Sequence, residues 1–263
     1  TDTVYPVELA GRTYQARLYK LAVTGYEGRT NTLNLFDLDT IDETIVHDGI
    51  LFDKTKIDKN LTLFLYPDDS DEAGRRLRIY QQYLMVSAGA QLILEESVAR
   101  GCKLHDLADY AAIQINDTHP ALVIPELMRI FMDEAGMSWD EAWDIASHSV
   151  AYTNHTVLAE ALERWPQQLV ESLLPRVWQI MQEIAHRWQT KVENFYHDPA
   201  KTEKMAIIWG GEVRMANLCI AGCLSVNGVS GLHSEILKKD VFKDACAMEP
   251  WKFTNVTNGI DHR

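Results

Sequence analysis

One pattern constrains this 263-residue sequence most strongly: a short apolar run that ends abruptly in a polar cluster, and it occurs twice. Residues 111–115 run into Asn-Asp-Thr-His at 116–119, and residues 151–153 run into Asn-His at 154–155. Runs this short are typical of buried strands, and a helical pattern follows the first of them. Strands that alternate with helices predict an α/β fold. Because no repeat, low-complexity tract or Gly/Ser linker interrupts the chain, we expect one α/β unit that is richer in helix than in strand.

The rest of the chain divides into elements by periodicity and by breaker residues. Gly136 suits the end of one helix, Ser138 and Glu141 form a capping-box pattern for the next, and Pro175 splits a long helical stretch. The expected strands are 4–9 and 13–18, which form a hairpin, and a short one at 60–66; residues 66–74 are a loop, and the expected helices are 75–100, 121–135, 139–147, 167–194, 212–226 and 230–239.

The charge balance excludes several classes of partner. The chain has 25 Lys and Arg against 38 Asp and Glu, a net charge of −13. A nucleic-acid or anionic-membrane binder needs a basic face, so neither function is expected. No apolar run approaches the roughly 20 residues of a membrane-spanning helix, and no signal peptide is visible, so a cytoplasmic location is expected. The acidic run of Asp37, Asp39, Asp42 and Glu43 is interpreted as solvated surface.

Cysteine and histidine spacing gives little support for disulfides or metals. Four cysteines are too sparse for a disulfide scaffold, and Cys219 and Cys223 are expected to be inert thiols on one buried helix face. A metal site built from Asp117, His119 and His155 remains an alternative, and the corresponding metal hydrolase would hold tightly bound zinc. Since the sequence has no H-E-x-x-H or Cys/His metal spacing, we expect no metal.

The polar clusters suit a sugar. In open α/β sheets, ligands sit beyond the carboxyl ends of the strands, which is where two of the clusters fall. Short planar polar side chains can bind two hydroxyl groups at once. Glu160 and Glu163 share one face if their segment is helical. The plainer alternative is structural: helix caps, turns and a satisfied core histidine. No Gly-rich phosphate loop and no nucleophile elbow is present.

Longer motifs resemble a known family. Residues 112–129 (AIQINDTHPALVIPELMR) and 151–166 (AYTNHTVLAEALERWP) resemble the signature of the glycogen (α-glucan) phosphorylases. Matches continue in order at 173–176, 215–220, 226–229 and 257–260, and upstream at 65–69 and 76–78.

This resemblance implies a glycosyltransferase with two Rossmann-like domains, the GT-B arrangement, that releases glucose 1-phosphate from an α-1,4-glucan and phosphate. Residues 1–263 would form the later, helix-rich part of its N-terminal domain, with the C-terminal cofactor domain absent. Pyridoxal phosphate would be held by a lysine beyond Arg263, so none is expected here, and the chain alone is expected to be inactive. The full enzyme would form a homodimer. The alternative class is a non-catalytic oligosaccharide-binding or dimerisation module.

The resemblance also assigns roles to residues. His155 and Asn258 would hydrogen-bond the transferred glucosyl unit, and residues 66–74 would form a mobile gate. The remaining expected substrate-binding residues are Asp117, His119, Glu160, Glu163, Asp69 and Ser70. Two departures from the family pattern are Ser70 in place of Asn and Ala159 in place of Pro.

A sharper departure concerns regulation. Glu95 and Glu96 stand where animal enzymes carry an arginine pair that binds the AMP phosphate, and two carboxylates would repel that phosphate. We therefore expect no AMP activation of that type. Micromolar AMP binding to the full-length enzyme, abolished by changing Glu95 or Glu96, would contradict this expectation.

Overall fold

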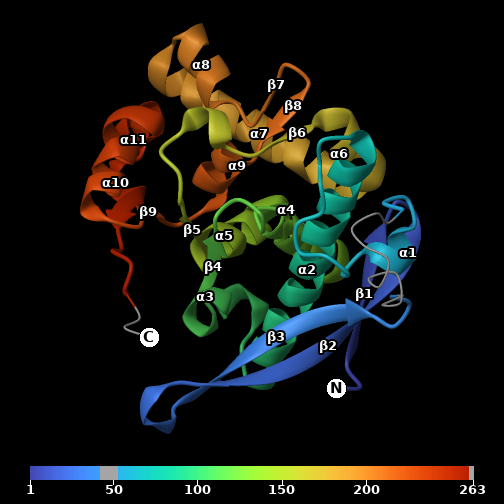
Figure 1. Ribbon diagram of the computed structural model, residues 1–263. Helices are drawn as coiled ribbons and strands as arrows, with labels where there is room; N and C mark the ends of the chain where they lie inside the picture. Colours follow the sequence, from blue (N-terminus) through green and yellow to red (C-terminus); the bar gives the residue numbers. More distant parts are fainter. Residues whose placement is uncertain (42–52, 261–263) are drawn as a thin grey trace. The chain divides into compact units, whose positions relative to one another are not determined.

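The computed structural model describes residues 1–41 and 53–260 (Figure 1). The chain divides into two compact units, Thr1–Leu92 and Ile93–Arg263, and the division falls inside one long helix. Asp42 and Glu43 of the acidic run lie outside the described residues.

The first unit is built on an antiparallel sheet with the strand order β1-β2-β3. The strands are β1 (Val4–Leu9), β2 (Arg12–Thr24) and β3 (Thr30–Leu38). The predicted hairpin is confirmed, with Ala10 and Gly11 at positive φ in its turn, but β2 is longer than predicted. Strand β3 was not predicted from the sequence, and it pairs with β2 from Ala16–Leu38 to Thr24–Thr30.

The predicted strand at 60–66 is wrong. A short helix, α1 (Ile57–Asn60), precedes a series of turns there. Side chains of the following helix supply the hydrogen bonds that a partner strand would have made: Gln81 Nε2 donates to the Phe64 carbonyl at 2.6 Å and Arg78 Nη1 to the Leu65 carbonyl at 3.2 Å. Because these carbonyls are satisfied, the segment needs no place in a sheet.

The long helix α2 (Glu72–Ala99) confirms the predicted one, although it begins before the predicted end of the loop at 74. Leu77, Leu84 and Ala88 on the predicted apolar face are fully buried. Gly101, at φ 95°, follows the end of the helix with the left-handed backbone that glycine tolerates.

The second unit contains a four-stranded parallel sheet with the order β10-β9-β5-β4. The strands are β4 (Ile113–Asn116), β5 (Val150–Thr153), β9 (Val226–Gly228) and β10 (Phe253–Asn255). The predictions of β4 and β5 are confirmed. The predicted helix at 212–226 is wrong at both ends, because β8 (Glu212–Arg214) and β9 flank a shorter helix.

Helices connect these strands, so the unit is a mixed α/β structure. The predicted capping box of Ser138 and Glu141 is present, and Pro175 begins a new helix after a break at Leu174. The helices are α3 (Leu107–Tyr110), α4 (Val123–Arg129, continued by a π-helical turn at Ile130–Glu134), α5 (Trp139–Ser149), α6 (Gln167–Leu173), α7 (Pro175–Tyr196), α8 (Pro199–Met205), α9 (Met215–Gly222), α10 (Gly231–Ile236, continued by a π-helical turn at Leu237–Val241) and α11 (Lys243–Met248).

A second, small antiparallel sheet of this unit has the order β6-β8-β7, where β6 is Arg164–Pro166 and β7 is Ile208–Trp209. The core includes the predicted stripe on α6 and α7, with Ile180 and Met181 buried, and both Cys219 and Cys223. Burial raises the pKa of both thiols, which keeps them protonated and unreactive, as expected. They do not share a helix face, because α9 ends at Gly222 and Cys223 has an extended backbone. Among the described helices, none has the length and apolar character needed to cross a bilayer.

Candidate functional site

The polar clusters of the sequence meet at one edge of the parallel sheet. All pairings among β4, β5, β9 and β10 are parallel, so the four carboxyl ends lie on the same side (Figure 1). The segments beyond these ends are 116–119, 154–156, 228–230 and 256–258. The prediction that polar clusters follow the carboxyl ends of β4 and β5 is confirmed. The loops after β9 and β10 lie at the same edge. We call this set of segments the carboxyl edge.

The ends of β4 and β5 are joined through His155. Its Nε2 lies 2.5 Å from Asn116 Oδ1, while the ring is exposed. Asp117 adopts φ 62°, and its backbone N–H donates to the Thr153 carbonyl at 2.9 Å. This left-handed backbone is uncommon for a residue other than glycine, and such strain clusters at functional sites.

His119 and Thr118 are both held by Glu163. His119 Nδ1 lies 3.2 Å from Glu163 Oε2, and Thr118 Oγ1 donates to Glu163 Oε1 at 3.2 Å. The side chain of Glu163 is 13% exposed and that of His119 is 42% exposed, so the carboxylate supports a ring that faces outward.

Glu160 does not share a face with Glu163. Only a single 3-10 turn, Ala159–Ala161, forms in this segment, and Glu163 lies beyond it, next to β6. The condition for a shared face, a helical segment, is therefore not met. Glu160 is exposed, whereas Glu163 is drawn toward His119 and Thr118.

A buried hydrogen-bond network fixes the backbone on both sides of His155. Asn154 is fully buried; its Nδ2 donates to the Tyr152 hydroxyl at 2.9 Å, and its Oδ1 accepts from the Thr156 N–H at 3.0 Å. Burial raises the pKa of Tyr152 well above its usual value, so the phenol stays protonated.

His233, on α10, completes this network. The Val229 N–H donates to His233 Nδ1 at 3.0 Å, which assigns the proton of the neutral ring to Nε2. Nε2 then donates, at 3.2 Å each, to Asn154 Oδ1 and the Thr156 carbonyl. The ring therefore bridges the loops after β5 and β9. His233 was not predicted from the sequence. Its signal there is Ser230, whose hydroxyl caps α10 by accepting from the His233 N–H.

Asn258 belongs to the same edge. Its backbone N–H donates to the Val229 carbonyl at 3.0 Å, and the Val256 N–H donates to Gly228 at 3.2 Å. Gly228 itself packs tightly, because a Cβ there would lie 2.6 Å from Ser234 Oγ. The loop after β10 is thus tied to the loop after β9, with Asn258 exposed beyond it.

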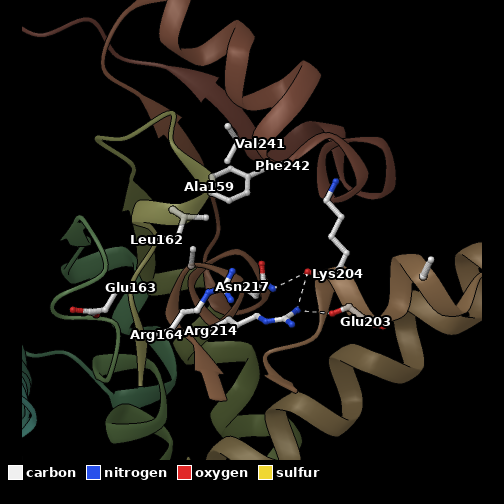
Figure 2. Close-up of a pocket in the computed structure, with 12 residues that line it drawn as sticks. Ala159, Leu162, Glu163, Arg164, Glu203, Lys204, Arg214, Asn217, Val241 and Phe242 are labelled. Atoms are coloured by element: carbon white, nitrogen blue, oxygen red, sulfur yellow. Dashed lines mark hydrogen bonds between the residues drawn. The ribbon is translucent and has the colours of Figure 1, made fainter. Parts of the chain in front are cut away.

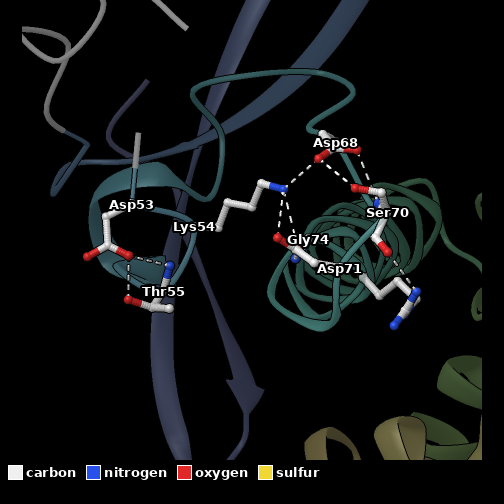
Figure 3. Close-up of polar contacts among 8 residues, drawn as sticks. Asp53, Lys54, Thr55, Asp68, Ser70, Asp71 and Gly74 are labelled. Carbon is white, nitrogen blue, oxygen red and sulfur yellow. Dashed lines mark hydrogen bonds and ion pairs between the residues drawn. The ribbon is translucent and has the colours of Figure 1, made fainter. Parts of the chain in front are cut away.

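The predicted gate residues lie in the first unit. Lys54 Nζ contacts Asp68 Oδ2 at 2.9 Å and Asp71 Oδ2 at 3.3 Å, and the Ser70 hydroxyl donates to Asp68 at 2.9 Å (Figure 3). Asp69 is exposed. The loop is therefore held by Lys54 and leaves Asp69 facing outward.

The carboxyl edge offers hydrogen-bonding groups rather than metal ligands. Within residues 1–41 and 53–260, no group of three or more His, Cys, Asp and Glu side chains is arranged to hold a metal ion. The edge presents amides, imidazoles and carboxylates, a set that donates to and accepts from hydroxyl groups. α/β proteins with an open parallel sheet bind their ligands at the carboxyl edge of that sheet, which is where these polar groups lie.

Comparison with known proteins defines the class further. Residues 4–263 match the family model described as Carbohydrate phosphorylase. The chain is 52% identical over 260 residues to maltodextrin phosphorylase of Streptococcus pneumoniae, and the aligned region covers 98% of this chain and 34% of that protein. It is 44% identical over 247 residues to glycogen phosphorylase of Bacillus subtilis, covering 93% and 31%, and 48% identical over 217 residues to the human muscle form of glycogen phosphorylase, covering 78% and 26%.

The chain belongs to the carbohydrate phosphorylase family. It spans about a third of the length of the curated relatives it matches. The family resemblance found in the sequence motifs is thereby confirmed.

Proposed function

We propose that this chain is the glucosyl-binding part of an α-1,4-glucan phosphorylase, from the N-terminal Rossmann-like domain of a GT-B enzyme. The observation that carries the proposal is the gathering of His155, Asp117, His119 and Asn258 at one carboxyl edge in a member of this family. The names of the relatives, maltodextrin and glycogen phosphorylase, support an α-glucan as the substrate. Phosphate is the second substrate, and the complete enzyme is a cytoplasmic homodimer.

In this proposal the chain's own residues bind and orient the sugar. His155 accepts from or donates to a hydroxyl of the transferred glucosyl unit, and Asn116 Oδ1 holds the ring of His155 in place. Asn258 contacts the same unit. Glu163 orients His119 toward the adjoining pocket, where Asp117 and Glu160 also contribute polar groups. Asp69 and Ser70 serve in the gate.

Pyridoxal phosphate, which the family implies, does not fit the residues of this edge. The loops at 116–122, 154–163, 228–231 and 256–260 contain neither lysine nor arginine. They therefore offer no amine for an imine bond to the cofactor and no fixed cation for its phosphate. We assign the cofactor to a part of the polypeptide outside this chain, and no step is derived through it.

The proposal is tested in the full-length enzyme with His155→Gln and Asn258→Ala. Each substitution removes a hydrogen bond to the substrate, so we expect kcat/KM for phosphorolysis of maltoheptaose to fall about 10- to 100-fold, or ~1.4–2.7 kcal/mol. His148→Gln, an exposed histidine on α5, is the matched control and should leave kcat/KM unchanged. Unchanged kcat/KM in both site variants would refute the assignment.

We also propose that the 263-residue chain, as a partial N-terminal domain, performs no phosphorolysis alone. The expected result is no glucose 1-phosphate above blank from maltoheptaose and phosphate. Titration of maltoheptaose against the chain and the full-length enzyme separates the two classes of function. Full affinity in the isolated chain would favour a non-catalytic binding module, and glucose 1-phosphate release would contradict the proposed inactivity.

A second candidate function, an interaction surface, is favoured by the ribbon of β2 and β3. Tyr19 pairs with Leu35 and Leu21 with Leu33 across one face, and with Val23 these side chains are 42–52% exposed. Exposed apolar patches of this kind mark interaction sites. Sedimentation equilibrium of the chain tests self-association: Leu21→Lys should abolish it, whereas Leu232→Lys on the exposed side of α10 should not.

A further inference from the structure

Two arginines face each other in the small antiparallel sheet of the second unit. Arg164 of β6 is the register partner of Arg214 of β8. Like charges directly opposite one another across an antiparallel pair destabilise the sheet. The fold therefore places two positive charges where they repel.

Within the described residues, neither arginine has a buried carboxylate in contact with it. Arg214 Nη1 donates to the carbonyls of Glu203 at 2.5 Å and Lys204 at 3.4 Å. The carboxylates of Glu212 and Glu203 act on Arg214 as nearby charges. Burial, and next the charge of Arg164, lower the pKa of Arg214, and these two carboxylates act in the opposite direction. Arg164 reaches Glu212 at only 3.4 Å, and both side chains are about half exposed, so that ion pair contributes little.

These arginines line a cavity of about 420 Å³. Asn217 lies beside them. Its Nδ2 donates to the Lys204 and Ala206 carbonyls, so its Oδ1 can accept a hydrogen bond from a ligand. Figure 2 shows Arg164, Arg214 and Asn217 together on one side of the pocket, with Leu162 and Phe242 opposite. The cavity thus has an apolar side and a charged side, where Arg164, Arg214 and Lys204 outnumber the two lining glutamates, Glu163 and Glu203.

We propose that this cavity is a binding site for a small anion with a ring, a phosphate monoester, which we call the arginine pocket. Its phosphate bridges Arg164 and Arg214, because a guanidinium matches phosphate geometry and the anion removes the repulsion between the two. The ring lies against Phe242, and its polar groups donate to Asn217 Oδ1.

The arginine pocket shares a wall with the carboxyl edge and uses different groups. Glu163 precedes Arg164 in the chain, but its carboxylate is turned away from the pocket toward His119 (Figure 2). The anion would be bound by side chains that take no part in the proposed glucosyl site. A failure of the proposed glucosyl site would therefore leave the proposal of the arginine pocket unaffected, and the reverse also holds.

The test is direct binding to the 263-residue chain, with phenyl phosphate and inorganic phosphate as probes and benzyl alcohol as the uncharged analogue. We expect saturable calorimetric binding of phenyl phosphate at one site, weaker binding of inorganic phosphate and none of benzyl alcohol. Raising the salt concentration should weaken binding, because the pocket is partly open to solvent. Equal binding of benzyl alcohol, or no saturable binding of either phosphate, would overturn the proposal.

Matched variants locate the site. Arg164→Gln and Arg214→Gln should each weaken phenyl phosphate binding at least tenfold, whereas Lys103→Gln, the same charge change at an exposed position outside the pocket, should not. If Arg214→Gln fails to fold, the exposed Arg164→Gln variant decides alone. Arg164→Gln should also abolish the rise in melting temperature that phenyl phosphate gives the unchanged chain. Retained affinity in Arg164→Gln would refute the assignment.

Discussion

Single residues decide whether the carboxyl edge keeps its shape. His233 accepts from a backbone N–H on one ring nitrogen and donates from the other to Asn154 and Thr156, so one imidazole holds two loops. β5 ends at Thr153 and β9 at Gly228, and one further backbone bond, from the Asn154 N–H to the Asn227 carbonyl at 2.9 Å, ties the first loop to β9. The position of His155 between Asn154 and Thr156 therefore depends on a side chain about 80 positions further along the chain.

His233→Gln is expected to lower the free energy of unfolding of the chain by about 1–3 kcal/mol, because it leaves buried hydrogen-bonding groups poorly paired. Urea denaturation followed by circular dichroism measures the change. His148→Gln, at an exposed site, should stay within about 0.5 kcal/mol of the unchanged chain. An unchanged free energy of unfolding in His233→Gln would show that the bridge does not stabilise the loops.

Alanine substitutions at two glycines of α2 are expected to change the stability of the chain in opposite directions. A Cβ on Gly74 would lie 1.9 Å from the Asp68 carbonyl oxygen, whereas a Cβ on Gly89 meets nothing within 4 Å. Gly74→Ala should therefore destabilise the chain by about 1–3 kcal/mol through overpacking. Gly89→Ala should stabilise it by about 0.5–1 kcal/mol, since alanine is the better helix former. Urea denaturation of the two variants checks the signs, and equal effects would contradict the proposed contact.

At the scale of elements, the loop before α2 is held by charge. Hydrogen bonds from Lys54, and next from Ser70, lower the pKa of Asp68 to about 2. A carboxyl group whose folded pKa lies below its unfolded value contributes stability above that unfolded value, and the contribution is lost as the pH falls toward the folded pKa. The loop contacts should therefore weaken between about pH 4 and pH 2.

Carboxyl chemical shifts in an NMR titration test this prediction. Lys54→Met should move the pKa of Asp68 back toward its ordinary value, because it removes the largest cause of the shift. Lys56→Met makes the same charge change two positions away and should leave Asp68 as it was. Equal shifts in the two variants would mean that general charge, and not the Lys54 contact, sets the pKa.

The elements also show what the sequence could predict. β4, β5, the capping box at Ser138 and the break at Pro175 were all predictable, because periodicity and cap chemistry are local signals. The segment at 60–66 and strand β9 were not, because long-range contacts decide them: α2 side chains satisfy the first, and pairing with β5 and β10 creates the second. Motif resemblance singled out His155 and Asn258 as candidate site residues, whereas His233 and the Arg164–Arg214 pair needed the fold.

At the scale of the whole chain, the order of strands explains how distant residues share one site. The sheet order β4-β5-β9-β10 follows the sequence. Each connection returns the chain to the amino edge, and the next strand then runs to the same carboxyl edge beside the previous strand. His155 thereby contacts Asn116, and the backbone of Asn258 is hydrogen-bonded to that of Val229 in the loop after β9. A sequence reader sees them as separate clusters, and only the parallel pairing brings them together.

This strand order also sets a sequence of events during synthesis. A nascent chain that has emerged only as far as β5 can join Asn116 to His155, but the bridge of His233 and the tether of Asn258 arrive with later residues. Pairings between distant segments form slowly, since loop closure must be completed before the contacts contribute. The loops after β4 and β5 therefore lack the contacts of His233 and Asn258 until the later residues have been synthesised.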